Sequence, residues 1–174
     1  MNELHANTSL QNRRYAIQKT LGQGGFGITY LAYDNVTRRQ VAIKEFFMKE
    51  LCNRNGKTRH MSVPSTGSKK LVDKFRAKFL KEANTIANLS HPNIIKIYDI
   101  FEENATAYYA MEYIPGGSLA DMLKKEPEQR LSEEEALHYL RQVAGALNYI
   151  HMLGINPLDI KPDNILNDHG RAVH

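Results

Sequence analysis

Hydrophobic and polar residues alternate along much of the first two thirds of the chain, as expected for strands with one buried face. Three strands are predicted at 15–21, 28–33 and 40–46, separated by short polar or glycine-rich segments. Two further alternating stretches, 94–101 and 106–113, flank a polar turn. Because short connections join antiparallel neighbours, the pattern predicts a five-stranded antiparallel sheet.

A longer period marks the predicted helices. Between residues 69 and 89, apolar side chains recur every three or four residues and form one stripe. The stripe consists of Val72, Phe75, Phe79, Ile86 and Leu89. A second helical pattern covers 132–153 and ends at Gly154. Ser118 and Ser132 each precede an acidic residue by three positions, the spacing of a capping box that opens a helix.

Pro115-Gly116-Gly117 separates the predicted strands from the later helices and predicts a boundary between two parts. We therefore expect an α+β fold with a tail at 1–14, a sheet and one helix at 15–114, and helices at 115–174. The polar stretch 51–68 is predicted to be a mobile loop or a surface insertion.

Composition narrows the class of protein. The chain has 174 residues and a net charge of +4. Of its residues, 42% are hydrophobic, a fraction that suits a packed core. Its single cysteine, Cys52, cannot form an internal disulfide, which favours a reducing, cytoplasmic setting. No signal peptide is visible, and no apolar run approaches the roughly 20 residues of a membrane-spanning helix.

The densest basic cluster is interpreted as a solvated helix face. Its members are Lys69, Lys70, Lys74, Arg76, Lys78 and Lys81. Because no aromatic-laced basic groove accompanies them, nucleic-acid binding is not expected.

A glycine-rich run, with Gly22, Gly24, Gly25 and Gly27, joins the first two predicted strands. Glycine turns bind phosphates because backbone N–H groups can approach an anion where no side chain intervenes. In a dinucleotide-binding fold such a run joins a strand to a helix, whereas here it joins two strands. The run therefore favours a flexible hairpin lid over phosphates, with an ordinary hairpin as the alternative.

Lys44 and Glu82 are the next candidates. Lys44 and Ala42 face the same side of a predicted strand. The lysine ammonium could bind a phosphate, and the small apolar alanine could leave room for an adjoining flat ring. Glu82 interrupts the apolar stripe of the 69–89 helix, where an unpaired charge would be costly, so we expect Lys44 to be its partner. The alternatives are a lysine at a strand edge and a carboxylate at the edge of the stripe that reaches water.

Asp159, Lys161 and Asn164 fall within six residues around Pro162. The aspartate could orient or deprotonate a hydroxyl, the lysine could neutralise a phosphoryl group, and the asparagine could bind a divalent metal. A plain polar turn is the alternative for each residue alone, but it explains the three together poorly.

In this order and spacing, the motifs resemble those of protein kinases of the bacterial serine/threonine type. They are Gly22-x-Gly24-x-x-Gly27, Val41-Ala42-Ile43-Lys44, Glu82, His91-Pro92-Asn93-Ile94, Met111-Glu112-Tyr113 and Asp159-x-Lys161-Pro162-x-Asn164-Ile165-Leu166. The resemblance implies a protein-kinase-like fold. Residues 15–114 would form the small lobe, and the chain would hold the first helices of a large lobe truncated before the Asp-Phe-Gly segment.

The resemblance also implies ATP and Mg²⁺ as cofactors and assigns site residues. Adenine would contact Leu21, Thr29, Ala42, Leu166, the gatekeeper Met111, and the backbone of Glu112 and Ile114. The phosphates would contact Gly22, Gly24, Gly25, Gly27 and Lys44, with Glu82 pairing with Lys44. Asp159 would be the catalytic base, Lys161 would support the γ-phosphate, and Asn164 would hold one magnesium ion.

Two departures from the family pattern bear on activity. Pro157-Leu158 replaces the usual His-Arg, so control through an arginine that reads a phosphorylated activation loop is not expected. The Asp-Phe-Gly metal site is also absent from residues 1–174. We therefore expect this stretch to be the ATP-binding part of a serine/threonine protein kinase, a transferase acting on an unidentified protein, and to be inactive by itself.

Other interpretations remain open. The main alternative is a pseudokinase or regulatory module that binds a nucleotide or a partner without catalysis, and a small-molecule kinase of the same fold is a third.

The 132–153 helix would normally bury an apolar face against parts of the large lobe absent here, which predicts self-association.

Overall fold

The structure is a computed structural model that describes residues 2–126, 128–156 and 160–174. The chain divides into two compact units. The first comprises Met1–Asn88 and Ile97–Tyr113, and the second comprises Leu89–Lys96 and Ile114–His174. The segment 89–96 therefore belongs to the second unit, although strands of the first unit follow it in sequence.

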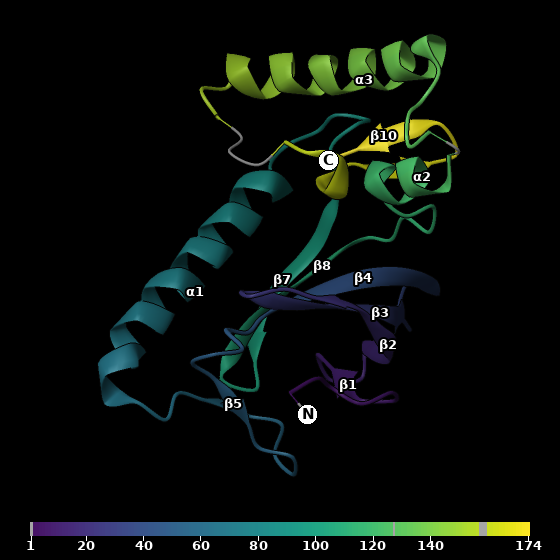
Figure 1. The fold of residues 1–174 in the computed structure, drawn as a ribbon. Helices are drawn as coiled ribbons and strands as arrows, with labels where there is room; N and C mark the ends of the chain where they lie inside the picture. Colours follow the sequence, from purple (N-terminus) through teal and green to yellow (C-terminus); the bar gives the residue numbers. More distant parts are fainter. Residues whose placement is uncertain (1, 127, 157–159) are drawn as a thin grey trace. The chain divides into compact units, whose positions relative to one another are not determined.

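The first unit is built on a six-stranded antiparallel sheet with the order β1-β2-β3-β4-β8-β7 (Figure 1). The strands are β1 (Ser9–Leu10), β2 (Tyr15–Gln23), β3 (Gly27–Asp34), β4 (Arg39–Phe46), β7 (Ile97–Glu103) and β8 (Thr106–Glu112). The five predicted strands are confirmed as β2, β3, β4, β7 and β8. β7 begins three residues later than predicted, because a turn in which the Ile94 amide donates to the His91 carbonyl precedes it.

The predicted N-terminal tail is part of this sheet. Its strand β1 pairs with β2, and Leu4, Thr8 and Leu10 are buried. The amides of Asn7 and Ile17 also donate across the pair, to the carbonyls of Ile17 and Thr8 respectively. The segment is therefore packed rather than a free tail.

Helix α1 (Thr66–Ala87) packs on β7 and β8. It begins three residues before the predicted start and ends at the C-cap Asn88. Its buried side chains are Val72 and Ala83, eleven residues and about three turns apart. On the same helix, the Phe79 ring lies 5.0 Å from the Tyr109 ring, centroid to centroid, which joins α1 to the sheet.

Residues 51–68 differ from the prediction of a mobile surface loop. They include a small hairpin, β5 (Asn53–Arg54) paired with β6 (Met61–Ser62), and the first residues of α1. Cys52 and Met61 are buried and join the core of the first unit. The polar composition of this stretch concealed the few residues that anchor it.

The second unit holds two helices and a small hairpin. The elements are α2 (Leu119–Lys125), α3 (Glu133–Met152), a 3-10 turn η1 (Pro162–Asn164), β9 (Leu166–Asp168) and β10 (Arg171–Val173). Both predicted capping boxes are confirmed: Ser118 with Asp121 opens α2, and Ser132 with Glu135 opens α3. α3 ends before Gly154, whose φ is +73°, a value that favours glycine. The hairpin β9–β10 was not predicted.

The core of the second unit consists of Leu119, Tyr139, Ile165 and Ala172. The segment 89–96 is tied to this core through the side-chain amide of Asn93, whose Nδ2 donates to Gln142 Oε1 and to the Ala172 carbonyl, both at 2.7 Å. Within the described ranges, no helix has both the length and the apolar content needed to cross a bilayer.

Candidate functional site

One face of the first unit's sheet carries several of the predicted nucleotide-binding residues. In the register of β3, β4 and β8, Lys44 lies opposite both Thr29 and Tyr109, and Ala42 lies opposite Met111. Directly opposed residues share a face, as do residues two apart on a strand. Thr29, Ala42, Lys44 and Met111 therefore lie on the same face.

The glycine-rich run forms the turn between β2 and β3, as predicted. The Gly24 amide donates to the Gly27 carbonyl at 2.9 Å. A Cβ at Gly27 would lie 2.7 Å from the Glu45 carbonyl oxygen and 3.7 Å from Lys44 Cε, so glycine permits the close approach of β3 to β4. A Cβ at Gly22, Gly24 or Gly25 would meet nothing within 4 Å. The fold does not require glycine at these three positions, and their backbone is bare enough for an anion to approach.

Phe26 at the tip of this turn contacts helix α1. Its ring lies 5.2 Å from the Phe75 ring, centroid to centroid, while 57% of the residue remains exposed. The Phe26 carbonyl accepts a hydrogen bond from the Phe47 amide at 3.1 Å. The tip of the turn is therefore attached to both α1 and the end of β4.

The predicted Lys44–Glu82 ion pair is not present among the described residues: no salt bridge joins the two side chains, and Glu82 is exposed. The buried side of α1 is centred on Val72 and Ala83, so Glu82 lies toward the edge of the stripe. The structure thus shows the alternative, a carboxylate that reaches water.

Tyr109 lies near both charges and was not identified from the sequence. Burial raises the pKa of its phenol; the Lys44 ammonium opposes this rise, and the Glu82 carboxylate adds to it. Tyr109 precedes Met111 by two residues on β8, so strand alternation could have placed it on the same face.

Glu45, the residue after Lys44, is fully buried on the opposite face of the sheet and was also missed. Its carboxylate accepts hydrogen bonds from the Tyr30 and Tyr108 hydroxyls, each at 2.8 Å. The Arg54 guanidinium, from strand β5, donates to the same carboxylate at 2.6 Å. Burial and then the Glu45 charge raise the pKa values of both phenols, which remain protonated donors.

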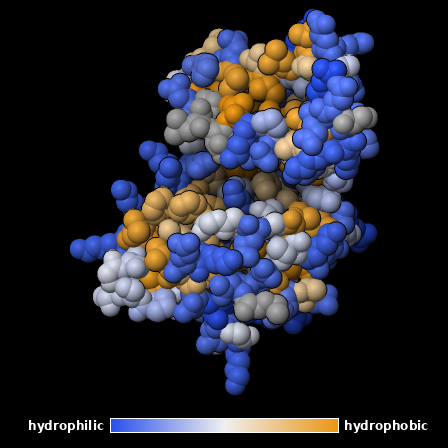
Figure 2. Space-filling view, viewed as in Figure 1, coloured by the Kyte–Doolittle hydropathy of each residue, from blue (hydrophilic) through white to orange (hydrophobic). Residues whose placement is uncertain are grey.

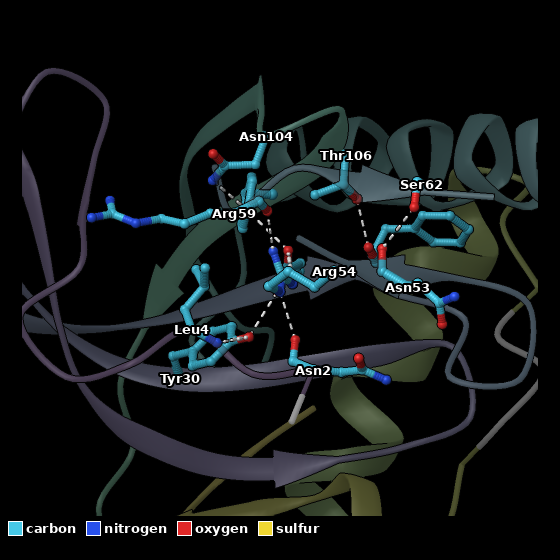
Figure 3. Close-up of polar contacts among 12 residues, drawn as sticks. Asn2, Leu4, Tyr30, Asn53, Arg54, Arg59, Ser62, Asn104 and Thr106 are labelled. Carbon is cyan, nitrogen blue, oxygen red and sulfur yellow. Dashed lines mark hydrogen bonds and ion pairs between the residues drawn. The ribbon is translucent and has the colours of Figure 1, made fainter. Parts of the chain in front are cut away.

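Arg54 is held by the N-terminal segment as well as by its own hairpin. Its side chain is 4% exposed, and it donates to the carbonyls of Asn2 at 2.6 Å and Arg59 at 2.8 Å. Figure 3 shows these two bonds together with the Leu4 amide, which donates to the Tyr30 hydroxyl at 3.1 Å. Burial opposes the charge on the guanidinium, but the Glu45 carboxylate holds the pKa of Arg54 above its ordinary value.

In the second unit, the turn η1 presents the residues around Pro162. The Asn164 amide donates to the Lys161 carbonyl at 2.9 Å, and both residues are exposed. The turn is anchored by Ile165, which is buried and whose carbonyl accepts from the Leu119 amide. Pro157, Leu158 and Asp159 lie outside the described residues.

The remaining predicted residues lie in both units. Leu21 in β2 is 41% exposed, and Glu112 ends β8. Ile114 is buried in the second unit, where Leu166 begins β9. Across the described ranges, no group of three or more His, Cys, Asp or Glu side chains could hold a metal ion. Asn164 offers an amide oxygen, a ligand type that Mg²⁺ accepts.

A family model described as "Protein kinase domain" matches residues 15–173. The serine/threonine-protein kinase PknD of Chlamydia trachomatis is 33% identical over 163 residues, covering 88% of this chain and 15% of PknD. PksC of Streptomyces coelicolor, also named a serine/threonine-protein kinase, is 33% identical over 168 residues, covering 93% of this chain and 27% of PksC. The chain therefore spans about a quarter or less of these curated relatives.

Solved structures show the same fold. The structure titled "PpkA-294 apo form" matches with a TM-score of 0.92 and 30% identity, covering 99% of this chain and 60% of that one. The PknI kinase domain of Mycobacterium tuberculosis matches with a TM-score of 0.74 and 23% identity, and covers 98% of this chain and 61% of that one.

Proposed function

This chain belongs to the protein kinase family, and we propose that it is the ATP-binding part of a cytoplasmic serine/threonine protein kinase. The whole protein would transfer the γ-phosphoryl group of MgATP to a hydroxyl of a protein substrate. The observation that carries the proposal is the sheet face on which Lys44 lies beside Thr29, Ala42 and the bare glycine turn.

In this proposal the apolar residues of that face bind adenine. Ala42 is small, and Met111 lies directly opposite it, so a flat ring could lie against the sheet beside the gatekeeper. Leu21, Thr29 and Leu166 would complete the contacts, and the backbone of Glu112 and Ile114 would hydrogen-bond the ring edge.

The phosphates would be bound by the glycine turn and Lys44. The open space at Gly22, Gly24 and Gly25 supports this role, because backbone N–H groups there can approach an anion. The half-buried Lys44 ammonium supplies a positive charge on the same face. Glu82 is exposed in this structure, and we propose that it pairs with Lys44 when nucleotide is bound.

The catalytic roles belong to the second unit. Asp159 would accept the proton of the substrate hydroxyl, Lys161 would neutralise the γ-phosphate, and Asn164 would hold one magnesium ion. Magnesium would offset the charge of the phosphates. Because residues 1–174 contain no Asp-Phe-Gly segment, we expect them to bind nucleotide without measurable phosphotransfer.

The test of the nucleotide site is the substitution Lys44→Met. A fluorescent ATP analogue should bind the wild-type chain, and the substitution should weaken binding by about tenfold or more, or roughly 1.4 kcal/mol. The control Lys57→Met removes an exposed lysine in the β5–β6 turn and should leave affinity unchanged. Equal affinity for wild type and Lys44→Met would refute the proposal.

A regulatory module without catalysis is the second candidate. Two features favour it: the lack of a Lys44–Glu82 ion pair among the described contacts, and Pro157-Leu158 in place of His-Arg. The deciding assay uses a chain that continues through an Asp-Phe-Gly segment, with radiolabelled ATP and a generic basic protein. Phosphate transfer lost on Asp159→Asn supports the kinase, and nucleotide binding without transfer supports the regulatory module.

A further inference from the structure

We infer that the buried Glu45–Arg54 pair positions Lys44 and the glycine turn for nucleotide binding, and that the N-terminal segment Asn2–Leu10 supports this pair. The inference rests on the proposed nucleotide site and adds positioning residues to it. These residues lie on the face of the sheet opposite Lys44, so they would act through the backbone of β4 and β3.

Glu45 is adjacent to both parts of the proposed phosphate site, which are Lys44 and the glycine turn. It follows Lys44 directly on β4, so anchoring its side chain on one face also orients the Lys44 side chain on the other. Its carbonyl oxygen lies 2.7 Å from the position of a Cβ at Gly27, the last glycine of the turn. A shift of β4 at Glu45 would therefore displace the ammonium and the glycine turn together.

The carboxylate of Glu45 is fixed from three elements. Tyr30 donates from β3, three residues after Gly27, and Tyr108 donates from β8. Arg54 supplies the balancing charge from the β5–β6 hairpin. Because a carboxylate with no exposed surface has no water to replace a lost donor, these bonds restrict β4 to one position between its neighbours.

The N-terminal segment completes this arrangement. Arg54 Nη2 bonds Glu45, while its Nη1 and Nε bond the carbonyls of Arg59 and Asn2. The Leu4 amide bonds the Tyr30 hydroxyl, which in turn donates to Glu45. Residues 2–4 therefore contact two of the three donors to Glu45, namely Arg54 and Tyr30, as Figure 3 shows for Asn2 and Leu4.

A second ion pair in the same unit provides a matched control. Asp34, 1% exposed, lies at the far end of β3 from Gly27, and Arg14 pairs with it at 3.3 Å. Asp34 lies seven positions after Gly27 on the extended strand, roughly 23 Å away at the usual rise per residue. Loss of this pair should weaken the fold without disturbing the glycine turn.

The experiment compares Arg54→Met with Arg14→Met in the 174-residue chain. Calorimetry measures the Kd of ATP and of adenosine for each variant, and thermal unfolding gives its Tm. We expect Arg54→Met to weaken ATP binding about tenfold and adenosine binding less than about twofold, because the phosphates are the part bound by Lys44 and the turn. Arg14→Met should lower Tm while keeping the ATP-to-adenosine affinity ratio of the wild type.

The outcomes separate the two proposals. A wild-type chain that binds neither ligand refutes the nucleotide site itself. An Arg54→Met chain with a lower Tm and an unchanged affinity ratio shows that the pair is structural and overturns the inference. If Arg54→Met does not fold, Arg54→Lys, which keeps the charge but not all three bonds, is the variant tested. Its affinity ratio should shift in the same direction, and an unchanged ratio overturns the inference.

Deletion of residues 1–4 tests the N-terminal part separately. The deletion removes the Asn2 carbonyl and the Leu4 amide while leaving the Glu45–Arg54 pair in place. We expect it to shift the affinity ratio as Arg54→Met does, by a smaller factor. A wild-type ratio in the shortened chain would remove the N-terminal segment from the inference.

Discussion

At the scale of single residues, the adjacent side chains of Lys44 and Glu45 on β4 lie on opposite faces of the sheet and have different roles. Lys44 is half-buried on the proposed nucleotide face, and Glu45 is buried in a polar network on the other. Strand alternation predicts that Lys44 and Ala42 lie on the same face of the sheet, and the strand register of the structure confirms this. The two phenols that donate to Glu45, Tyr30 in β3 and Tyr108 in β8, lie 15 and 63 positions away in the sequence, and no local pattern links them to it.

The substitution Glu45→Gln should be strongly destabilising. It would leave the Arg54 guanidinium buried beside a neutral amide, and breaking a buried ion pair in this way costs about 3–5 kcal/mol. Urea unfolding followed by circular dichroism measures the change. The exposed neighbour Glu50 provides the control Glu50→Gln, which should alter the free energy of unfolding by less than about 0.5 kcal/mol. A loss under about 1 kcal/mol for Glu45→Gln would show that water reaches Arg54.

Asp34 should make the first unit sensitive to acid. Burial opposes its ionisation, but hydrogen bonds from Arg14, Thr37 and Val36 hold the pKa of its carboxyl below the ordinary value of 3.8. In the acid range the unfolded chain therefore binds more protons than the folded chain at this site. The stabilisation that ionised Asp34 gives the folded state is complete above the pKa that this carboxyl has in the unfolded chain. It is lost as the pH falls through the lower pKa that the carboxyl has in the folded chain.

Unfolding in urea at a series of acidic pH values tests this expectation. The free energy of unfolding should decrease with falling pH, and Asp34→Asn should make the decrease shallower. A variant whose acid sensitivity equals that of the wild type would show that other carboxyls cause it.

At the scale of elements, local signals predicted helix ends better than short strands. The Ser-x-x-acid spacing located the starts of α2 and α3 because a capping box is made by residues three apart. The hairpins β5–β6 and β9–β10 have strands of two or three residues, too short to show alternation. Two bonds to distant parts of the chain hold the β5–β6 hairpin: Arg54 donates to the Asn2 carbonyl, and the Met61 amide donates to the Asn104 carbonyl.

The cap of α3 can be tested with Ser132→Ala. The Ser132 hydroxyl accepts a hydrogen bond from the Glu135 amide, and its loss should cost about 1 kcal/mol of stability. The Ser132 hydroxyl and backbone amide also hold the pKa of Glu135 below its ordinary value. Carboxyl carbon NMR should show that this pKa returns toward the ordinary value in the variant. No change in the pKa would mean that the capping box does not persist in solution.

At the scale of the whole molecule, α3 exposes apolar side chains. Leu140 is 62% and Met152 80% exposed, and hydrophobic residues reach the surface in the upper part of the view in Figure 2. The self-association predicted from the sequence has a structural candidate in this surface.

The substitution Leu140→Glu tests that surface. Multi-angle light scattering at increasing concentration should show self-association of the wild-type chain and a shift toward monomer for the variant. Val36, 70% exposed in the first unit, provides the control Val36→Glu, which should leave the wild-type mass unchanged. A monomeric wild type at high concentration would contradict the prediction.

The sequence by itself determined the five main strands, the long helix, the capped helices and the family. These features depend on short-range periodicity, on residues three or four apart, and on motifs in a fixed order. Only the tertiary structure decided that Glu82 is exposed, that Ser9–Leu10 form an edge strand beside β2, and that Arg54 balances Glu45. The physical reason is that a buried charge must find its partner in space, and that partner can come from any part of the chain.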